Sequence, residues 1–287
     1  MLRARIITAV ILAAVFLGAM FTLPPFGWTL FTFVITLTAF WEWTRIAPLN
    51  GITAKIFLGV TFLAGLVLLY LFSGEWSDPT AQSSQRAYSI VTIAASLFWM
   101  VIVPLWLKFG WRPKNGWALA ATGWLVIFPT WFAVIQHRSH GPWMLLGLMA
   151  LVWVADIAAY FTGRAFGKHK LAPGISPGKT WEGVAGAVIG VLIYVAICVR
   201  FVTHSGDRSM EAMIASWPVV VIASLLLVAL SITGDLFESW MKRGAGLKDS
   251  SNLLPGHGGV LDRLDALTST LPVAPIIFLI ATRLATS

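Results

Sequence analysis

Acidic residues gather in two stretches of the second half of the sequence. Seven of the 12 Asp and Glu residues lie there: Asp156, Glu182, Asp235, Glu238, Asp249, Asp262 and Asp265. Asp262 and Asp265 are three positions apart and can point together, and Asp235 ends another apolar run. Carboxylates that converge from two helix ends suit a hard divalent cation such as Mg²⁺, which also binds the phosphate oxygens of a substrate. The second stretch therefore predicts a metal site.

Basic residues and glycines accompany the second group of acids. The four cations there can neutralise a polyphosphate: Lys242, Arg243, Lys248 and Arg263. His257 lies between Gly256 and Gly258-Gly259, in a loop tight enough to wrap a ligand. Alternatively, the cations mark only a membrane side and the glycines only a turn. The density of acids, bases and glycines, with little hydrophobic filler, favours a functional site.

The first stretch places three polar residues on one helical face. Asp156, Tyr160 and Arg164 are spaced at i, i+4 and i+8. Asp156 would lie some 12 Å below Arg164 at about 1.5 Å per residue. A carboxylate at that depth requires a polar cavity or a partner. Direct substrate contact and a structural ion pair both remain open for Asp156.

Ser176-Pro177-Gly178-Lys179-Thr180 is similar to the end of a phosphate-binding P-loop. The first glycine of that motif and its preceding strand are absent, so the P-loop fold is rejected. The chemistry can still be similar, because Lys179 supplies a charge and Thr180 a hydroxyl at a helix start. The alternative is a polar turn in which Thr180 caps a helix and Glu182 lies in its first turn.

The elements that position these residues are membrane helices. The chain has 287 residues, of which 58% are hydrophobic and 11% charged, whereas soluble domains carry about 25% charged residues. The net charge of +8 does not indicate nucleic acid, because the basic residues lie in short loops between apolar runs. The single cysteine, Cys198, excludes a disulfide within the chain. One all-α membrane domain over residues 1–287 is expected.

Nine apolar runs are long enough to cross a bilayer. They lie at 6–23, 27–45, 56–72, 87–107, 116–135, 142–163, 184–202, 213–233 and 267–284. With a cytoplasmic N-terminus, 15 of the 20 Lys and Arg residues fall on the cytoplasmic side and 5 outside, as the positive-inside rule requires. Both acidic stretches then share the cytoplasmic face. The link Leu23-Pro24-Pro25-Phe26 is either a tight turn or a re-entrant hairpin.

The residue order from Ser239 to Asp265 resembles the signature of phosphatidate cytidylyltransferases. It reads S-x-x-K-R-x-x-x-x-K-D-x-S-x-x-L-P-G-H-G-G-x-x-D-R-x-D. The block D-x-x-A-Y-F-x-G-R-x-F-G-K from Asp156, with S-P-x-K-T-x-E-G from Ser176, is similar to a second block of that family. The resemblance covers residues 150–270. Residues 1–140 resemble bacterial members only loosely, through Leu-Pro-Pro and Trp41-Glu42-Trp43.

The resemblance implies an enzyme that makes CDP-diacylglycerol and pyrophosphate from CTP and phosphatidate. It implies Mg²⁺, with room for a second cation, and a homodimer in the bacterial inner membrane with the site facing the cytoplasm. Asp235 and Asp262, with Asp265, are the expected metal ligands. The catalytic set joins Asp235 and Asp262 to Lys242, Arg243, Lys248 and Arg263. The expected substrate-binding residues are Asp156, Tyr160, Arg164, Ser176, Lys179, Thr180, Glu182, Ser239, Asp249, His257, Gly258 and Gly259.

Other functions fit parts of the pattern. A CTP-dependent polyprenol kinase would use similar residues but release CDP. A transporter would place polar residues at mid-membrane on several helices and often show inverted repeats, and neither feature is evident. The D-G-x-x-A-R pattern of CDP-alcohol phosphotransferases is absent. The lipid cytidylyltransferase therefore remains the leading hypothesis.

Overall fold

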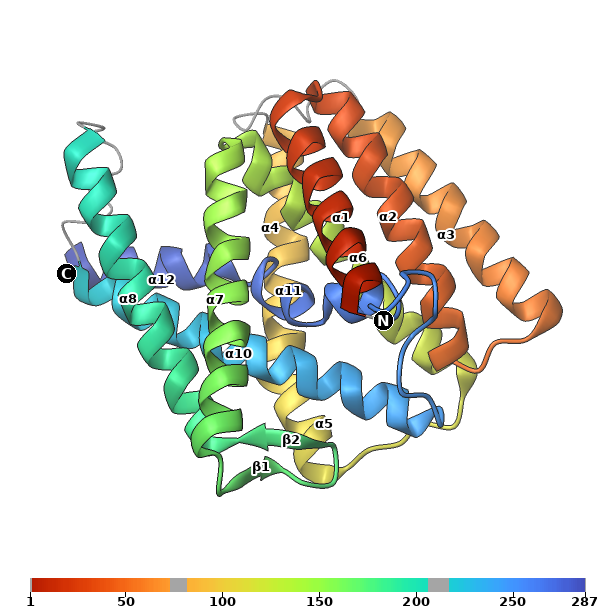
Figure 1. Ribbon diagram of the computed structural model, residues 1–287. Coiled ribbons are helices and arrows are strands. Elements are labelled where there is room, and N and C mark those ends of the chain that lie inside the picture. Colours follow the sequence, from red (N-terminus) through yellow and green to blue (C-terminus); the bar gives the residue numbers. More distant parts are fainter. Residues whose placement is uncertain (1, 73–81, 206–216, 287) are drawn as a thin grey trace.

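The computed structural model describes residues 2–72, 82–205 and 217–286. The chain folds as an all-α bundle (Figure 1). Helices α1 (Leu2–Thr22) and α2 (Pro25–Ile46) form a hairpin, and α3 (Gly51–Phe72) lies beside α2. Pro25 occupies the first turn of α2, where no backbone N–H is needed. The proline link is therefore a tight turn between two helices of 21 and 22 residues.

A proline shapes the next helical segment. Helix α4 (Gln82–Leu97) continues through a π-helical turn, η1 (Phe98–Ile102), into α5 (Val103–Phe109). Pro104 has no N–H to donate to the carbonyl four residues earlier, so the regular α pattern is interrupted beside it. Helix α6 (Gly116–Ser139) is capped at its start by Asn115, whose side chain accepts the Trp117 N–H at 2.9 Å.

Helices α7 (Pro142–Phe166) and α8 (Trp181–Ser205) form the most closely packed pair. Gly186 faces Thr162, and Gly190 faces Ala158, with no room for a side chain on either glycine. The strands β1 (Lys170–Ala172) and β2 (Ser176–Thr180) join the two helices as an antiparallel hairpin. Figure 1 shows this hairpin at the ends of α7 and α8. The sequence indicated no strand here, and a polar turn was one of the two interpretations of this segment.

Helix α10 (Trp217–Gly244) crosses α7 at a steep angle (Figure 1). Residues 245–260, here called the α10–η2 loop, lead to the 3₁₀ turn η2 (Leu261–Arg263). Two further helices follow, α11 (Asp265–Thr270) and α12 (Ala274–Thr286). The expected span 267–284 is therefore divided rather than one helix. Pro275 has no N–H for the Leu271 carbonyl, which instead contacts His137 Nε2 at 2.9 Å.

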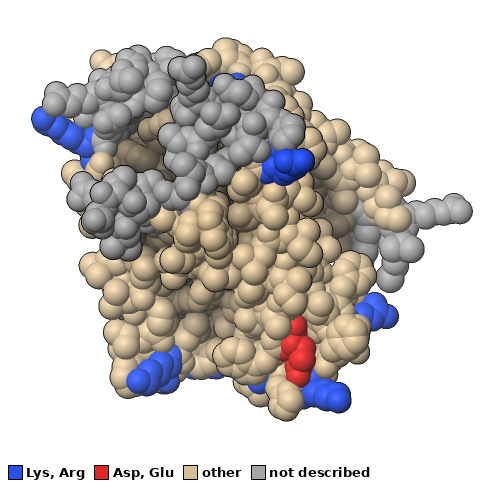
Figure 2. Space-filling model, turned by 90° about the vertical axis from the view of Figure 1, so that its left-hand side faces the viewer, with Lys and Arg blue, Asp and Glu red and all other residues tan. Residues whose placement is uncertain are grey.

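The described helices form a multi-pass membrane bundle. Six are long and apolar enough to cross a bilayer: Gly51–Tyr70, Tyr88–Phe109, Gly116–Ser139, Pro142–Phe166, Trp181–Phe201 and Trp217–Gly244. Ile6–Thr22 is a shorter apolar helix. Figure 2 shows a face made mostly of uncharged residues, with Lys and Arg side chains along its lower edge and others in its upper part. The predicted count of nine crossings and the cytoplasmic N-terminus remain predictions.

Tryptophan contributes strongly to the core of the bundle. Trp28, Trp43, Trp99 and Trp131 are among the largest fully buried side chains. Trp43 donates its indole N–H to the Leu119 carbonyl at 2.8 Å, which joins α2 to α6. These tryptophans therefore hold helices together rather than forming an aromatic belt at the interface.

Candidate active site

Asp262 organises the α10–η2 loop from the turn that follows it. Its buried carboxylate accepts hydrogen bonds from the Gly259 N–H at 2.8 Å and the Ser250 N–H at 2.9 Å. Lys242 Nζ lies 2.5 Å from its other oxygen. Burial disfavours the charged form, but these donors outweigh burial and lower the pKa of Asp262. The loop is therefore folded around an ionised carboxylate.

Lys242 lies between two carboxylates on different segments. Its Nζ is 3.0 Å from Glu238 Oε1, one turn earlier on α10, and 2.5 Å from Asp262 Oδ1. The Lys242 side chain is only 10% exposed. This cation was expected to bind phosphate, and the structure places it in a buried ion-pair network that fixes α10 to η2. Arg243, its neighbour, is exposed and donates to the Leu247 carbonyl at 3.3 Å.

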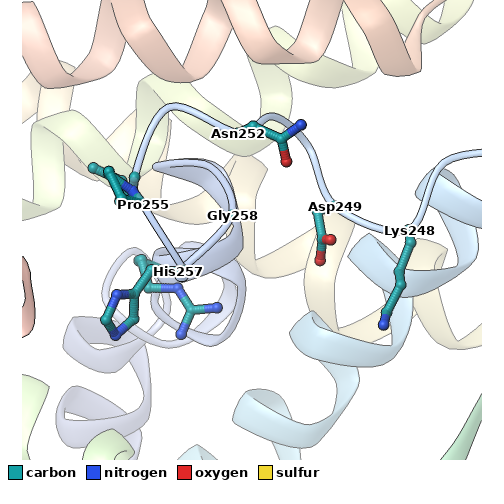
Figure 3. Close-up of a pocket in the computed structure, with 9 residues that line it drawn as sticks. Lys248, Asp249, Asn252, Pro255, His257 and Gly258 are labelled. Atoms are coloured by element: carbon teal, nitrogen blue, oxygen red, sulfur yellow. The ribbon is translucent and has the colours of Figure 1, made fainter. Parts of the chain in front are cut away.

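The α10–η2 loop surrounds a polar hollow of about 630 Å³, here called the loop pocket. It is lined by Lys248, Asp249, Asn252, Leu254, Pro255, Gly256, His257, Gly258 and Arg263. Figure 3 shows the loop arching over the hollow, with Lys248 and Asp249 near one end and His257 near the other. Gly256 and Gly258 have φ of 76° and 78°, in the left-handed region that favours glycine.

Two observations suit the loop pocket to an anion. Lys248, Arg263 and His257 all line it, so cationic and hydrogen-bonding groups converge on one space. His257 Nδ1 is buried and has no hydrogen-bond partner within the described part of the chain. A buried polar atom without a partner is costly unless a ligand or water satisfies it. The predicted residues Asp249, His257 and Gly258 thus lie together in one site.

The two acidic stretches meet outside this loop. Lys179 on β2 lies 2.5 Å from Asp235 on α10, and the two side chains are 23% and 29% exposed. Ser239 donates to the same carboxylate at 3.3 Å. Burial, then the nearby Asp235 carboxylate, and also that of Asp156, raise the pKa of Asp265. Residues from α7, the β1–β2 hairpin, α10 and α11 therefore converge. The sequence analysis predicted that the two acidic stretches would come together in this way.

The carboxylates present have the donor chemistry of a divalent-cation site. Oxygen ligands suit Mg²⁺, which needs only one or two carboxylates when phosphates and water complete the coordination. Asp235 and Asp262 each already attract a lysine ammonium at 2.5 Å. Among the described residues, no three His, Cys, Asp or Glu side chains form a ready-made metal cage. A cation held by these carboxylates would need phosphate or water oxygens to complete its coordination.

Several predicted residues serve the β1–β2 hairpin and its helices. The Thr180 hydroxyl accepts the Gly183 N–H at 3.1 Å, as expected for the capping alternative. Glu182 contacts His169 Nδ1 at 2.7 Å. Arg164 donates to the Tyr160 hydroxyl at 3.0 Å, and both side chains are exposed. Ser176 pairs in register with Ala172. Within the described ranges, Asp156 forms no ion pair.

Glu42 on α2 was not among the predicted site residues. It is fully buried and accepts hydrogen bonds from Ser251 Oγ at 2.6 Å and the Leu261 N–H at 2.7 Å. The Val260 N–H and Ser250 Oγ donate at 2.9 and 3.1 Å. In the sequence, Glu42 is a lone acid in an apolar run, a position that usually marks function. The sequence therefore marked Glu42 as a candidate, but it could not show which residues donate hydrogen bonds to it.

Arg45 adds a second contact from the same helix. Its guanidinium donates to the Ser250 carbonyl at 2.8 Å. Gly259 is packed against both Glu42 and Ser250, so that a side chain at this position would collide with them. Helix α2, from the half of the chain with the weaker motif resemblance, thus shapes the α10–η2 loop directly.

Comparison with known proteins adds independent information. The cytidylyltransferase family matches residues 3–281. A protein of Haemophilus influenzae named phosphatidate cytidylyltransferase is 38% identical, over 95% of this chain and 96% of its own length. A protein of the same name from Pseudomonas aeruginosa is 36% identical, over 95% of both chains. Another, from Staphylococcus saprophyticus, is 29% identical over 97% of this chain and 99% of its own.

Proposed function

The chain belongs to the cytidylyltransferase family, and from this membership we propose that it converts CTP and phosphatidate into CDP-diacylglycerol and pyrophosphate. The protein is a nucleotidyltransferase of phospholipid biosynthesis. Relatives that carry the name phosphatidate cytidylyltransferase match it over nearly their full length. The multi-pass helices suit an enzyme whose second substrate lies in a bilayer.

The contact between Lys179 and Asp235 is the observation that carries this proposal furthest. It joins the β1–β2 hairpin to α10, near Asp265 at the start of α11. A reaction between two phosphates needs cations and metal-binding oxygens from several segments, because two anions must approach each other. Both kinds of group are present where the acidic stretches meet.

In the proposed reaction, a phosphate oxygen of phosphatidate forms a bond to the α-phosphorus of CTP. The bond from that phosphorus to the bridging oxygen of pyrophosphate breaks, and the electron pair leaves with pyrophosphate. No general base is required, since the lipid phosphate is already an anion. Lys248 and Arg263 would bind the polyphosphate, with His257 contacting the nucleotide or a phosphate, and Lys179 with Arg164 would assist from the first stretch.

The family depends on a divalent cation, and we propose Mg²⁺. Asp235, Asp262 and Asp265 would hold it, with Asp156 close by. When bound, the metal supplies charge neutralisation and orientation of phosphate oxygens. Lys179 and Lys242 each contact one of these carboxylates.

We further propose a homodimer in the bacterial inner membrane with the site facing the cytoplasm. The family resemblance supports the dimer and the compartment, together with bacterial relatives. The excess of Lys and Arg on the loops that carry the site supports its orientation. CTP is cytosolic and phosphatidate lies in the leaflet, so a site at this interface reaches both.

Product analysis of the purified protein tests the proposal. With labelled CTP, phosphatidate and Mg²⁺, the expected products are CDP-diacylglycerol and pyrophosphate, each dependent on both substrates. Release of CDP with phosphorylation of a polyprenol would instead identify a lipid kinase. Failure to form either product in a lipid environment, with a folded protein, would contradict the proposed reaction.

A further inference from the structure

The segment 252–259 of the α10–η2 loop is flanked on both sides by residues that are hydrogen-bonded to one carboxylate. Ser250 and Ser251, where the loop enters the site, donate side-chain hydrogen bonds to Glu42. Val260 and Leu261, where it leaves, donate backbone hydrogen bonds to the same side chain. Six of the residues between them line the loop pocket: Asn252, Leu254, Pro255, Gly256, His257 and Gly258. Glu42 therefore closes the base of a loop whose tip forms the pocket wall.

The geometry of the donors requires a carboxylate at this position. Ser251 Oγ and the Val260 N–H reach one oxygen of Glu42. Ser250 Oγ and the Leu261 N–H reach the other. An ionised carboxylate offers acceptors on both sides, whereas an amide would present its NH₂ group to one of these pairs. A neutral amide of the same shape would therefore lose hydrogen bonds to one of the two pairs of donors.

Ser250 also connects Glu42 with Asp262. Its hydroxyl oxygen lies 3.1 Å from Glu42 Oε2 and 3.0 Å from Asp262 Oδ2. A hydroxyl has one proton to donate, so the two carboxylates share it. Arg45 holds the carbonyl of the same serine. The position of the expected metal ligand Asp262 is thus linked through one residue to helix α2.

We propose that Glu42 is a positioning residue for nucleotide binding, which fixes the α10–η2 loop from helix α2 without contacting the substrate. The inference rests on the proposed function in taking CTP as the ligand of the loop pocket. The role of Glu42 is to hold the pocket wall in a binding geometry before CTP binds. Glu42 then lowers the conformational cost of binding rather than contributing contacts of its own.

The test compares Glu42→Gln with a control of similar burial. Thr61 on α3 is fully buried and accepts the Trp124 indole N–H at 2.9 Å, so Thr61→Val also removes a buried hydrogen bond. Glu42→Gln should weaken the binding of labelled CTP, with Mg²⁺ present, by about tenfold. It should leave the KM for phosphatidate within about twofold, and Thr61→Val should change neither quantity. Ser251→Ala, which removes one of the donors, should shift CTP binding in the same direction by less.

Loop order is measured separately with a spin label. Leu253 is 49% exposed and does not line the loop pocket, so a nitroxide on Leu253→Cys, with Cys198→Ser, reports the loop. The label should be restricted in the parent protein and Thr61→Val, and mobile in Glu42→Gln.

A restricted label in Glu42→Gln, or mobility without weaker CTP binding, would overturn the proposal. Equal weakening in Thr61→Val would overturn it too. If the parent protein binds CTP but makes no CDP-diacylglycerol, the proposed reaction fails while this comparison stands.

Discussion

The α10–η2 loop and the β1–β2 hairpin both bring polar residues to the site, but they are held in different ways. The α10–η2 loop is bound to two buried carboxylates, Glu42 and Asp262, mainly through backbone and serine donors. The hairpin is held by contacts of partly exposed side chains, chiefly Lys179 with Asp235 and His169 with Glu182. One segment is built into the protein core, and the other rests on its surface.

This difference separates two uses of charge. In the buried network, charges fix the backbone, and removing one leaves others unpaired in a medium that solvates them poorly. On the hairpin, water can replace a lost partner, so that charge is available for a substrate at little structural cost. Variants of the loop network should therefore change both stability and activity. Variants of the hairpin should leave stability unchanged, and only those that remove a group near the reacting phosphates should lower activity.

The largest effect on activity is expected at the proposed metal ligands. Asp235→Asn and Asp262→Asn should each lower kcat by about a hundredfold to a thousandfold, because charge stabilisation at the reacting phosphates is lost. Asp235→Asn should keep its melting temperature, since Asp235 is 29% exposed. Asp262→Asn should have a lower melting temperature, because the NH₂ group of the new amide would face N–H groups whose hydrogen bonds the Asp262 carboxylate accepts. Assays of turnover and of thermal unfolding in detergent check both. Full activity in both variants would contradict the metal assignment.

The largest effect on stability is expected at Lys242. Lys242→Met keeps much of the side-chain volume but leaves the carboxylates of Glu238 and Asp262 without their shared cation. Breaking a buried pair in this way should cost about 3–5 kcal/mol. Thermal unfolding and the yield of folded protein measure the loss. The double variant Glu238→Gln/Lys242→Met should recover part of it, and a stable Lys242→Met protein would argue against a structural role.

A smaller and purely functional effect is expected at Lys179. Lys179→Ala should lower kcat/KM by about tenfold to a hundredfold, since one cation near the reacting phosphates is lost. Its melting temperature should change little, because a partly exposed pair contributes about 0–1 kcal/mol. Lys170 on β1 is an exposed control on the same hairpin, and Lys170→Ala should retain activity. Equal losses in the two variants would indicate only a general effect of charge.

The smallest effect is expected at the His169–Glu182 contact. His169 is 79% exposed, and its ring lies 2.7 Å from Glu182. His169→Ala should keep activity within about twofold and leave the melting temperature unchanged. Steady-state kinetics and thermal unfolding check this expectation. A large loss of activity would show that the hairpin needs fixed geometry, and the comparison between the two segments would then fail.

The sequence predicted the helical membrane bundle and the grouping of the acidic stretches, because apolar runs and charge order are local signals. It could not reveal that Lys242 lies between Glu238 and Asp262, since a cation in a polar loop looks the same whether buried or exposed. The division of the run 267–284 was visible in its prolines, but overall apolarity obscured it. Glu42 was missed for a different reason. Its partners lie 208 to 219 positions away in the chain.

That separation also sets the order in which the protein can be completed. Helix α2 leaves the ribosome long before Ser250 and Leu261 are made, and synthesis proceeds at about 5–20 residues per second. The Glu42 carboxylate therefore waits roughly 10–40 s for the donors it will bind. During that interval the nascent chain carries an uncompensated acid in an early helix. The last quarter of the chain then supplies these donors. A chain that ended before Ser250 would therefore keep the Glu42 carboxylate without them.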